Sequence, residues 1–270
     1  MKQYLIADSG GTKTDWCLID SKGEKSFFTT ESTHPSNWND TFFKRIKHFL
    51  QEIPKIELTD LYFFGSGCLN EEKRIFITNK FKQLSFNKVS VKSDIHAAGY
   101  ALFGSGTGWG AIMGTGSVVF KWNGKDVEEI IGGKGHLEGD EGSGFYFGNL
   151  IYEDYLNNRL STDQKNIFLN YLDKNSERAK FQLVKNRAVI AKDVYAYKES
   201  FHGYHEKNLE LFYLKHLENN SISSLRIVGG YGFHHSSILS LFFDQKKIAV
   251  NLIIDKPIAN LVEQMGSFID

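Results

Sequence analysis

The sequence predicts an α/β protein of two domains, each built on a mixed sheet, with a cleft between them. The chain has 270 residues, which fits two modest domains at about 100–200 residues each. Short apolar runs alternate with helical patterns after an opening pair of strands, which indicates sheets with a parallel portion. Several expected strands end in glycine or aspartate clusters, and strand carboxyl ends line the ligand crevice in open α/β sheets.

The first half of the chain predicts two strands joined by a glycine turn, followed by alternating helices and strands. Apolar runs bounded by turn residues predict strands over 4–7, 16–19, 26–30, 61–64 and 89–91. Apolar residues three and four positions apart predict helices over 42–50, 71–84 and 95–103.

The second half restarts the glycine-rich pattern, which hints at an internal duplication. Strands are expected over 110–114, 117–120, 225–228 and 250–254, a mostly helical stretch over 141–219, and a helix after Pro257, where proline suits the first turn. The run G-S-G-T-G at 104–108 is the most flexible stretch. Domains are therefore expected over 1–105 and 106–256, with the terminal helix 257–270 completing the first.

Composition excludes several classes of protein. Lys plus Arg number 32 and Asp plus Glu number 32, so no global field draws the chain to nucleic acid or an anionic membrane. Cys17 and Cys68 form no C-x-x-C pair, which argues against a disulfide framework or a thiolate metal site. The opening M-K-Q-Y-L-I-A-D predicts no signal peptide, and no apolar run reaches the roughly 18 residues of a membrane span. A cytoplasmic protein is expected, and a homodimer is left open.

Two glycine clusters have the chemistry of phosphate-binding hairpins. In D-S-G-G-T-K-T-D at 8–15, glycines let backbone N–H groups approach phosphate oxygens, and Lys13 and the threonine hydroxyls add donors. Asp8 is suited to holding Mg²⁺ through water. The segment G-T-G-S at 114–117 offers a second set of donors. Ordinary glycine turns are the alternative for both, and no Walker motif occurs in the chain.

Asp94 is the candidate catalytic base. It follows an expected strand and precedes a helix of small residues, where a carboxylate can accept a proton from a substrate hydroxyl during phosphoryl transfer. The alternative is a simple N-cap for the helix that starts at Ile95.

Three motifs resemble the N-acetylglucosamine kinase and glucosamine kinase family. They are D-S-G-G-T-K-T-D-W at 8–16, G-T-G-S at 114–117 and G-G-K-G-H-L-E-G-D-E-G-S-G at 132–144. That family lies in the actin, hexokinase and Hsp70 superfamily, which also holds the ATPases that activate benzoyl-CoA reductase. The resemblance covers the first 150 residues best. It implies two actin-like (ribonuclease H-like) domains and ATP- and Mg²⁺-dependent phosphorylation of an amino sugar. The leading candidates for the substrate are N-acetylglucosamine and glucosamine, phosphorylated on the 6-hydroxyl.

The resemblance also implies roles for individual residues, with Asp94 as base. ATP phosphates would be bound by Gly10, Gly11, Thr12 and Lys13 and by Gly114, Thr115, Gly116 and Ser117. The adenosine motif would be Gly229 and Gly230. The sugar side would comprise Asn37, Ser66, Gly67, Gly133, Lys134, Asp140 and Glu141, where paired carboxylates suit a polyol. His136 is interpreted as a structural histidine.

Two departures from the family keep alternatives open. Lys134 stands where family members often carry an aromatic or apolar residue, so it either favours an anionic sugar such as N-acetylmuramate or is solvated. The segment 144–225 is shorter than expected for the family.

Two other functions are weighed against sugar phosphorylation. An ATPase coupled to a partner protein, like the reductase activators, would need cysteines for an iron–sulfur cluster, and Cys17 and Cys68 do not match that pattern. A catalytically weak sugar sensor of the same fold would be expected to carry an N-terminal helix-turn-helix or a cysteine-rich zinc loop, and neither is found in the sequence.

Overall fold

The chain divides into two compact units in a computed structural model that describes residues 2–135, 139–174, 188–193, 197 and 199–269. Unit 1 comprises Met1–Ser105, Gly124–Asp126 and Pro257–Asp270, and unit 2 comprises Gly106–Asn123 and Val127–Lys256. None of the helices in the described residues is both long and apolar enough to cross a membrane.

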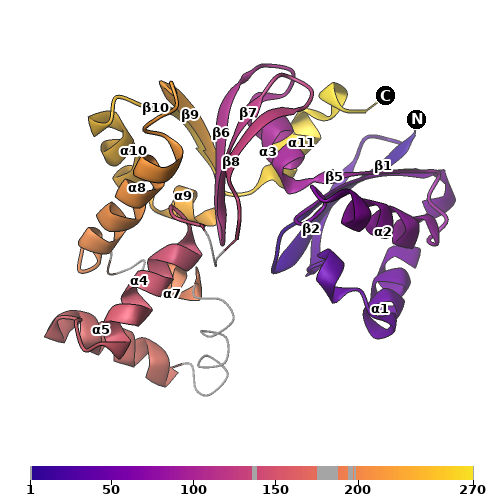
Figure 1. The fold of residues 1–270 in the computed structure, drawn as a ribbon. Helices are drawn as coiled ribbons and strands as arrows, with labels where there is room; N and C mark the ends of the chain where they lie inside the picture. The colour runs from indigo at the N-terminus through magenta and orange to yellow at the C-terminus, as the bar shows by residue number, and fades with distance from the viewer. Residues whose placement is uncertain (1, 136–138, 175–187, 194–196, 198, 270) are drawn as a thin grey trace. The chain divides into compact units, whose positions relative to one another are not determined.

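Unit 1 is built on a five-stranded mixed sheet of order β3-β2-β1-β4-β5. In Figure 1 this sheet is drawn in indigo to purple, with β1, β2 and β5 labelled. The strands β1 (Gln3–Ser9), β2 (Lys13–Ile19) and β3 (Lys25–Glu31) form an antiparallel meander. β4 (Thr59–Gly65) and β5 (Lys88–Ser93) continue it in parallel with β1. The helices are α1 (Asp40–Gln51), α2 (Glu71–Lys82), α3 (Asp94–Phe103) and α11 (Pro257–Glu263), with 3-10 turns η1 (Pro35–Asn37), η2 (Ile56–Leu58) and η4 (Met265–Ser267).

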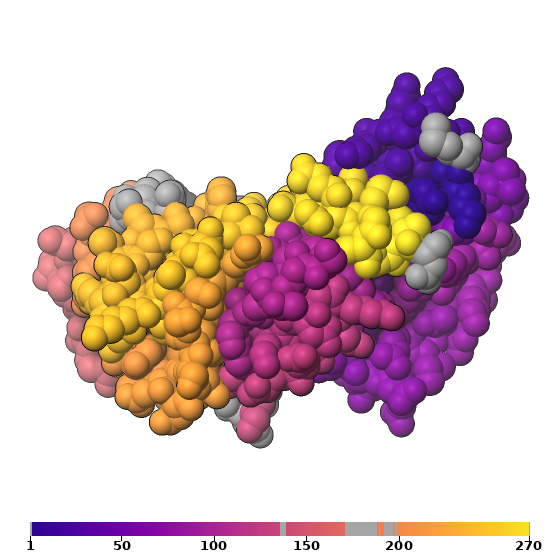
Figure 2. Space-filling view, turned by 90° about the horizontal axis from the view of Figure 1, so that it is seen from above, coloured from indigo at the N-terminus to yellow at the C-terminus, as the bar shows by residue number. Residues whose placement is uncertain are grey.

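Alternating side chains of β4 serve the two faces of this sheet. Phe63 belongs to the core that includes Phe81 of α2. Phe64 points to the other face, where it contacts Tyr100 of α3 and Phe268 near the C-terminus. α11 packs against α3, β1 and β2, and Figure 2 shows the C-terminal residues in yellow beside the indigo N-terminal residues. Burying both faces explains why residues 61–64 of β4 are hydrophobic without alternation.

Unit 2 repeats this architecture with the order β10-β9-β6-β7-β8. The strands β6 (Gly108–Met113), β7 (Ser117–Trp122) and β8 (Val127–Gly132) form the antiparallel meander, and β9 (Ser224–Val228) and β10 (Ala249–Ile254) are parallel to β6. The helices are α4 (Gly144–Leu156), α5 (Thr162–Lys174), α7 (Ala188–Asp193), α8 (His202–His216), α9 (Gly230–His234) and α10 (Ser236–Gln245). Read from β8 to β10, the strand order of unit 2 corresponds to that of unit 1 read from β3 to β5. This match supports the internal duplication that the sequence indicated.

The sequence located most of these strands and α-helices, but it did not predict β8, α9 and α10. β8 was not expected, because most of its residues are exposed or half-buried and its segment Val127–Gly132 carries two glutamates. The helices α9 and α10 were also missed, although α10 buries Leu239, Phe242 and Phe243. The predicted α/β class with two mixed sheets is confirmed.

Candidate active site

The hairpin between β1 and β2 exposes the first predicted phosphate motif. The Gly10 N–H donates to the Lys13 carbonyl at 3.0 Å, which closes the turn. Gly11 and Thr12 are exposed. A Cβ added at Gly11 would meet nothing within 4 Å, and the Gly11 backbone is not left-handed. The fold therefore does not need glycine at this position, whereas a ligand that approaches the backbone closely would need it.

Buried hydroxyl groups hold this hairpin in place. Ser9 Oγ accepts hydrogen bonds from Thr14 Oγ1 and Thr33 Oγ1, each at 2.9 Å, and the two threonine hydroxyls lie 2.8 Å apart. Ser32 Oγ donates to the Gly10 carbonyl at 2.7 Å. We call Ser9, Thr14, Ser32 and Thr33 the hydroxyl brace; it contains no group that titrates near neutral pH.

Charged side chains line the same hairpin. Lys13 Nζ lies 3.1 Å from Asp15 Oδ2, and Thr29 Oγ1 donates to Asp15 Oδ1 at 2.6 Å. Asp8, which is half-buried, faces Asp15 across the two strands. Mg²⁺ in kinases is usually held by one or two carboxylates together with waters and substrate phosphates. Asp8 fits that arrangement, and the described residues hold no cluster of three or more metal-binding side chains.

Asp94 is the first residue of α3, directly after β5. Its Oδ1 accepts a hydrogen bond from the Ile95 N–H at 3.1 Å, and the Ser66 hydroxyl donates to the same carboxylate. Burial raises the pKa of Asp94, which these hydrogen bonds only partly offset. Asp94 as a residue is half-buried, and its raised pKa makes the carboxylate a better proton acceptor than that of an ordinary aspartate.

Three of the predicted sugar-side residues lie at the end of the unit 1 sheet that is followed by Asp94. The Ser66 N–H donates to the Ser9 carbonyl at 2.8 Å, which joins the ends of β4 and β1. Gly67 has φ +81°, and a Cβ there would lie 2.9 Å from Nε2 of His34. Asn37 is exposed in η1, and its Nδ2 donates to the Ser32 carbonyl at 2.9 Å. The structure thus brings Asn37, Ser66 and Gly67 to the edge that carries Asp94.

Both cysteines are buried free thiols. Burial raises the pKa of Cys17 to about 11 and that of Cys68 to about 12, so both thiols stay protonated at neutral pH. Neither has the thiolate character that a reactive or metal-binding cysteine needs.

The second predicted phosphate motif forms the β6–β7 hairpin of unit 2. Thr115 is exposed, and a Cβ added at Gly114 would meet nothing within 4 Å. Gly114 therefore resembles Gly11 in being a glycine that the fold itself does not require. A Cβ at Gly116, by contrast, would lie 3.0 Å from the Asp140 carboxylate.

The segment 140–145 supports this hairpin through four hydrogen bonds. Two of them are made by Ser117, whose N–H donates to Asp140 Oδ1 at 3.1 Å and whose Oγ donates to the Glu141 carbonyl at 2.6 Å. The other two come from the start of α4: the Gly144 N–H donates to the Gly114 carbonyl at 2.8 Å, and the Phe145 N–H donates to the Thr115 carbonyl at 3.1 Å. The D-E-G-S-G element is thus a support for the predicted phosphate motif.

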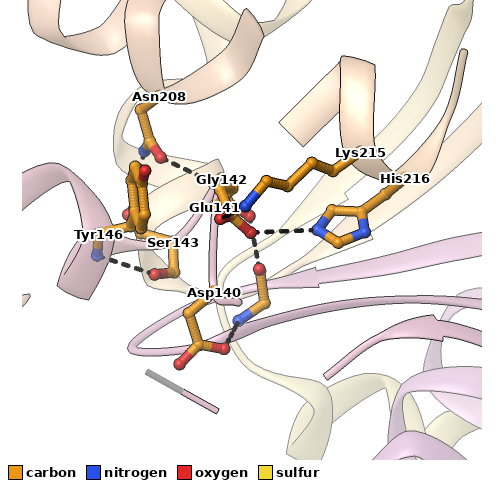
Figure 3. Close-up of polar contacts among 9 residues, drawn as sticks. Asp140, Glu141, Gly142, Ser143, Tyr146, Asn208, Lys215 and His216 are labelled. Atoms are coloured by element: carbon orange, nitrogen blue, oxygen red, sulfur yellow. Dashed lines mark hydrogen bonds and ion pairs between the residues drawn. The ribbon is translucent and has the colours of Figure 1, made fainter. Parts of the chain in front are cut away.

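Asp140 and Glu141, predicted to bind sugar, both have partners inside unit 2 (Figure 3). Asp140 is buried, with φ +69°, and is engaged by Ser117. Glu141 is buried, forms an ion pair with Lys215, and has its Oε2 3.4 Å from Nε2 of His216. Burial alone would raise the pKa of Glu141, but the Lys215 ammonium lowers it overall. A contact of these carboxylates with sugar stays a prediction.

Asn208 of α8 is a supporting residue that the sequence did not reveal. Its Oδ1 accepts the Gly142 N–H at 2.7 Å, and its Nδ2 donates to the Ser143 carbonyl at 3.1 Å and to the Tyr231 hydroxyl at 3.0 Å. Tyr231 also lies 2.9 Å from Nδ1 of His205. We call Asp140, Glu141, Asn208, Tyr231 and His205 the polar brace; it links the predicted adenosine motif to the hairpin support.

The remaining predicted residues differ in how the fold uses them. Gly229 has φ +127°, and a Cβ there would lie 2.7 Å from the Met113 backbone, so glycine is required by the fold. At Gly230, the first residue of α9, a Cβ would make only an ordinary contact with Asp255. Gly133 has φ +69°, and Lys134 is exposed. His136 lies outside the described residues.

No family model matches the chain. Among curated proteins, it is 29% identical over 161 residues to the N-acetylmuramic acid/N-acetylglucosamine kinase of Clostridium acetobutylicum, covering 55% of this chain and 51% of that protein. The chain therefore spans about half the length of this relative.

Solved structures resemble the whole chain. A provisionally named N-acetylglucosamine kinase from Porphyromonas gingivalis superposes with a TM-score of 0.86 at 21% identity, covering 98% of this chain and 99% of that one. A second such protein, from Chromobacterium violaceum, gives 0.70 at 16% identity over 98% and 99%. A ROK family glucokinase from Streptomyces griseus, in complex with glucose and AMPPNP, gives 0.57 at 14% identity over 98% and 97%.

At these identities the likeness establishes the fold, which is that of the actin-like sugar kinases. The resemblance inferred from the three motifs is thereby confirmed for the fold. That the segment 144–225 is shorter than is usual for the family stays a prediction.

Proposed function

We propose that this protein is an ATP-dependent cytoplasmic kinase that phosphorylates an amino sugar, N-acetylglucosamine or glucosamine on the 6-hydroxyl. The observation that carries the proposal is the arrangement of Asp94, a half-buried residue directly after β5 whose carboxyl pKa is raised by burial and which accepts hydrogen bonds from Ser66 and the Ile95 N–H. The fold of the sugar kinases and the name of the curated relative agree with it.

Asp94 would act as general base. Ser66 and the Ile95 N–H hold its carboxylate in one orientation, so an oxygen remains to accept the proton of the sugar hydroxyl as that hydroxyl attacks phosphorus. A positioned base of this kind typically contributes about 10²–10⁴ in rate.

Backbone N–H groups around Gly11 and Gly114 would bind the phosphates of ATP. Thr12 and Lys13 lie beside Gly11 in the first hairpin, and Thr115 and Ser117 lie beside Gly114 in the second. The open space beside both glycines is what such close approach requires. Asp8 would hold Mg²⁺ through water; when bound, this ion neutralises charge on the transferred phosphoryl group. Gly229 and Gly230 would contact adenosine.

N-acetylmuramate is the second candidate substrate. The name of the curated relative includes N-acetylmuramic acid. The exposed Lys134 offers a cation for the lactyl carboxylate of that sugar. The solvated interpretation of Lys134 is favoured, because an exposed side chain reaches water easily.

A coupled ADP-release assay across glucosamine, N-acetylglucosamine, N-acetylmuramate and glucose tests the proposal. Release that depends on an amino sugar is the expected result. Release that is independent of sugar would indicate a partner-coupled ATPase, and sugar binding without release would indicate a sensor; either outcome would overturn the kinase assignment.

A further inference from the structure

A hydrogen-bonded chain of three side chains in unit 1 leads from the protein surface to the residue before Asp94. Asp126 Oδ1 lies 2.8 Å from His96 Nε2, and His96 Nδ1 lies 2.8 Å from Ser93 Oγ. The exposed fraction of the side chains falls from 67% for Asp126 to 14% for His96, and Ser93 is buried. Neither the glycine motifs nor the sugar-side residues account for this chain.

The partners of His96 determine its tautomer. An ionised carboxylate only accepts hydrogen bonds, so Nε2 carries the proton and donates to Asp126. Nδ1 of a neutral imidazole is then an acceptor, and the Ser93 hydroxyl donates to it. Burial lowers the pKa of His96; the cations Lys92 and Arg74 lower it further, while Asp126 raises it in part. A neutral ring at physiological pH agrees with this assignment.

The use of the Ser93 hydroxyl is unusual for its position. Ser93 is the N-cap of α3, where serine normally accepts an N–H of the first helical turn, yet it makes no side-chain cap. The Ile95 N–H is instead taken by the carboxylate of Asp94. By engaging Ser93, His96 leaves this N–H to Asp94.

The same three residue types form the triad of serine hydrolases, but hydrolysis does not fit here. Ser93 has a relative exposure of 1% and cannot reach a substrate. The contacts are also exchanged, since serine faces Nδ1 and aspartate faces Nε2. The hydrogen-bonded series Asp126–His96–Ser93 is suited to holding a neighbouring residue in place and not to nucleophilic attack.

We propose that His96 and Asp126 are positioning residues that, through Ser93, hold the carboxylate of Asp94 in the orientation that accepts the substrate proton. This inference rests on the proposed function, because it takes Asp94 as the base. His96 touches no reacting atom and acts only through its neighbour.

Two substitutions of His96 separate the two contacts. In His96→Gln the side-chain amide reaches the position of Nε2, so the Asp126 contact is kept and the Ser93 contact is lost. In His96→Asn the amide occupies the position of Nδ1, so the Ser93 contact is kept. His48→Gln is the matched control, because His48 pairs with Glu52 at 3.7 Å on the exposed face of α1.

We expect His96→Gln to lower kcat about tenfold with KM for ATP and sugar changed less than about twofold, and His96→Asn to lose clearly less. His48→Gln should match the wild type. A turnover of His96→Gln equal to that of His48→Gln would overturn the proposal. Equal losses in both His96 variants, tracking a lower melting temperature, would also overturn it, because they would show a merely structural role.

A readout without turnover keeps the inference separate from the kinase assignment. Carbon-13 NMR of the aspartate carboxyl groups should show the titration of Asp94 displaced by about half a pH unit in His96→Gln relative to His48→Gln. Long-range proton–nitrogen spectra should show His96 protonated on Nε2. If the wild type shows no turnover but both NMR results are as expected, the kinase assignment is wrong and the positioning role of His96 is supported. If the Asp94 titration is the same in His96→Gln and His48→Gln, the positioning role is wrong.

Discussion

The two predicted phosphate hairpins expose similar chemistry but are supported in different ways. Each offers one glycine, Gly11 or Gly114, that has open space beside it and that the fold does not need. The unit 1 hairpin rests on the hydroxyl brace, whereas the unit 2 hairpin rests on the polar brace of carboxylates, amide and imidazole. The difference between the supports predicts which hairpin responds to pH, and the open space beside Gly11 and Gly114 distinguishes them from glycines that the fold requires.

The largest effect is expected at Gly229, where the fold requires glycine. Gly229→Ala would place a methyl group 2.7 Å from the Met113 backbone in a left-handed conformation, at a cost of at least about 3 kcal/mol in unfolding free energy. Gly230→Ala is the matched control, since its Cβ has 3.5 Å to Asp255. Urea unfolding of both variants measures the difference, and equal midpoints would contradict the assignment of Gly229 to the fold.

The next largest effect is expected on ligand binding without loss of stability. Gly11→Val and Gly114→Val should abolish ATP binding in titration calorimetry while leaving the melting temperature nearly unchanged, because the added side chains enter open space. Unchanged affinity in either variant would show that its hairpin is merely a turn. A change in only one would show that the two hairpins differ in function as well as in support.

Removing one contact from each brace should lower the free energy of unfolding by different amounts. Asn208→Ala leaves the buried Gly142 N–H without its acceptor, which should cost about 2–3 kcal/mol of unfolding free energy. Thr33→Val removes one hydroxyl from the hydroxyl brace at similar volume and should cost about 1 kcal/mol. Chemical unfolding measures both, with the Gly142 amide exchange rate as a local readout. A reversed order would mean that the hydroxyl brace is the stronger support.

Acid should loosen the β6–β7 hairpin, which rests on a brace with an imidazole, before the β1–β2 hairpin, which rests on hydroxyl groups alone. Burial, together with His235 and His202, lowers the pKa of His205 from 6.5 to about 2, so the folded state keeps this ring neutral while the unfolded state binds a proton. Stability from His205 is fully present above pH 6.5 and falls as pH drops below it, by up to about 1.4 kcal/mol per pH unit.

Hydrogen exchange at pH 7 and pH 5 tests this difference between the braces. After correction for intrinsic rates, amides of 114–117 should lose protection at pH 5 more than amides of 10–13. His205→Asn, which cannot titrate, should reduce the contrast. Equal losses in both hairpins would contradict the role of the imidazole.

The smallest effect is expected at Lys134. An exposed charge is typically worth under about 1 kcal/mol, so Lys134→Ala should change kcat/KM for N-acetylglucosamine and N-acetylmuramate by less than about fivefold. A loss of about ten- to a hundredfold confined to N-acetylmuramate would instead show a charge-assisted bond to its carboxylate. Steady-state kinetics on both sugars distinguishes these outcomes.

The sequence predicted what depends on neighbours along the chain. Glycines at strand ends indicated both hairpins, and the strand-to-helix position of Asp94 indicated a base; the structure adds that Ser66 orients this carboxylate. The supports could not be predicted, because they join distant segments: Asn208 contacts Gly142 from 66 positions away. Asp140 and Glu141 were assigned to sugar by motif alone, and only the structure shows that their carboxylates already have partners in unit 2.

Phosphorus NMR of a mixture of ATP, Mg²⁺ and N-acetylglucosamine, with wild type and Asp94→Asn in parallel, tests the central claim most directly. We predict a sugar phosphate resonance that grows as ATP is consumed by the wild type. Asp94→Asn should lower kcat at least about a hundredfold with nucleotide affinity nearly intact, because it removes a proton acceptor and no phosphate contact. Normal turnover in Asp94→Asn, or ATP consumption by the wild type without a sugar phosphate, would contradict the account.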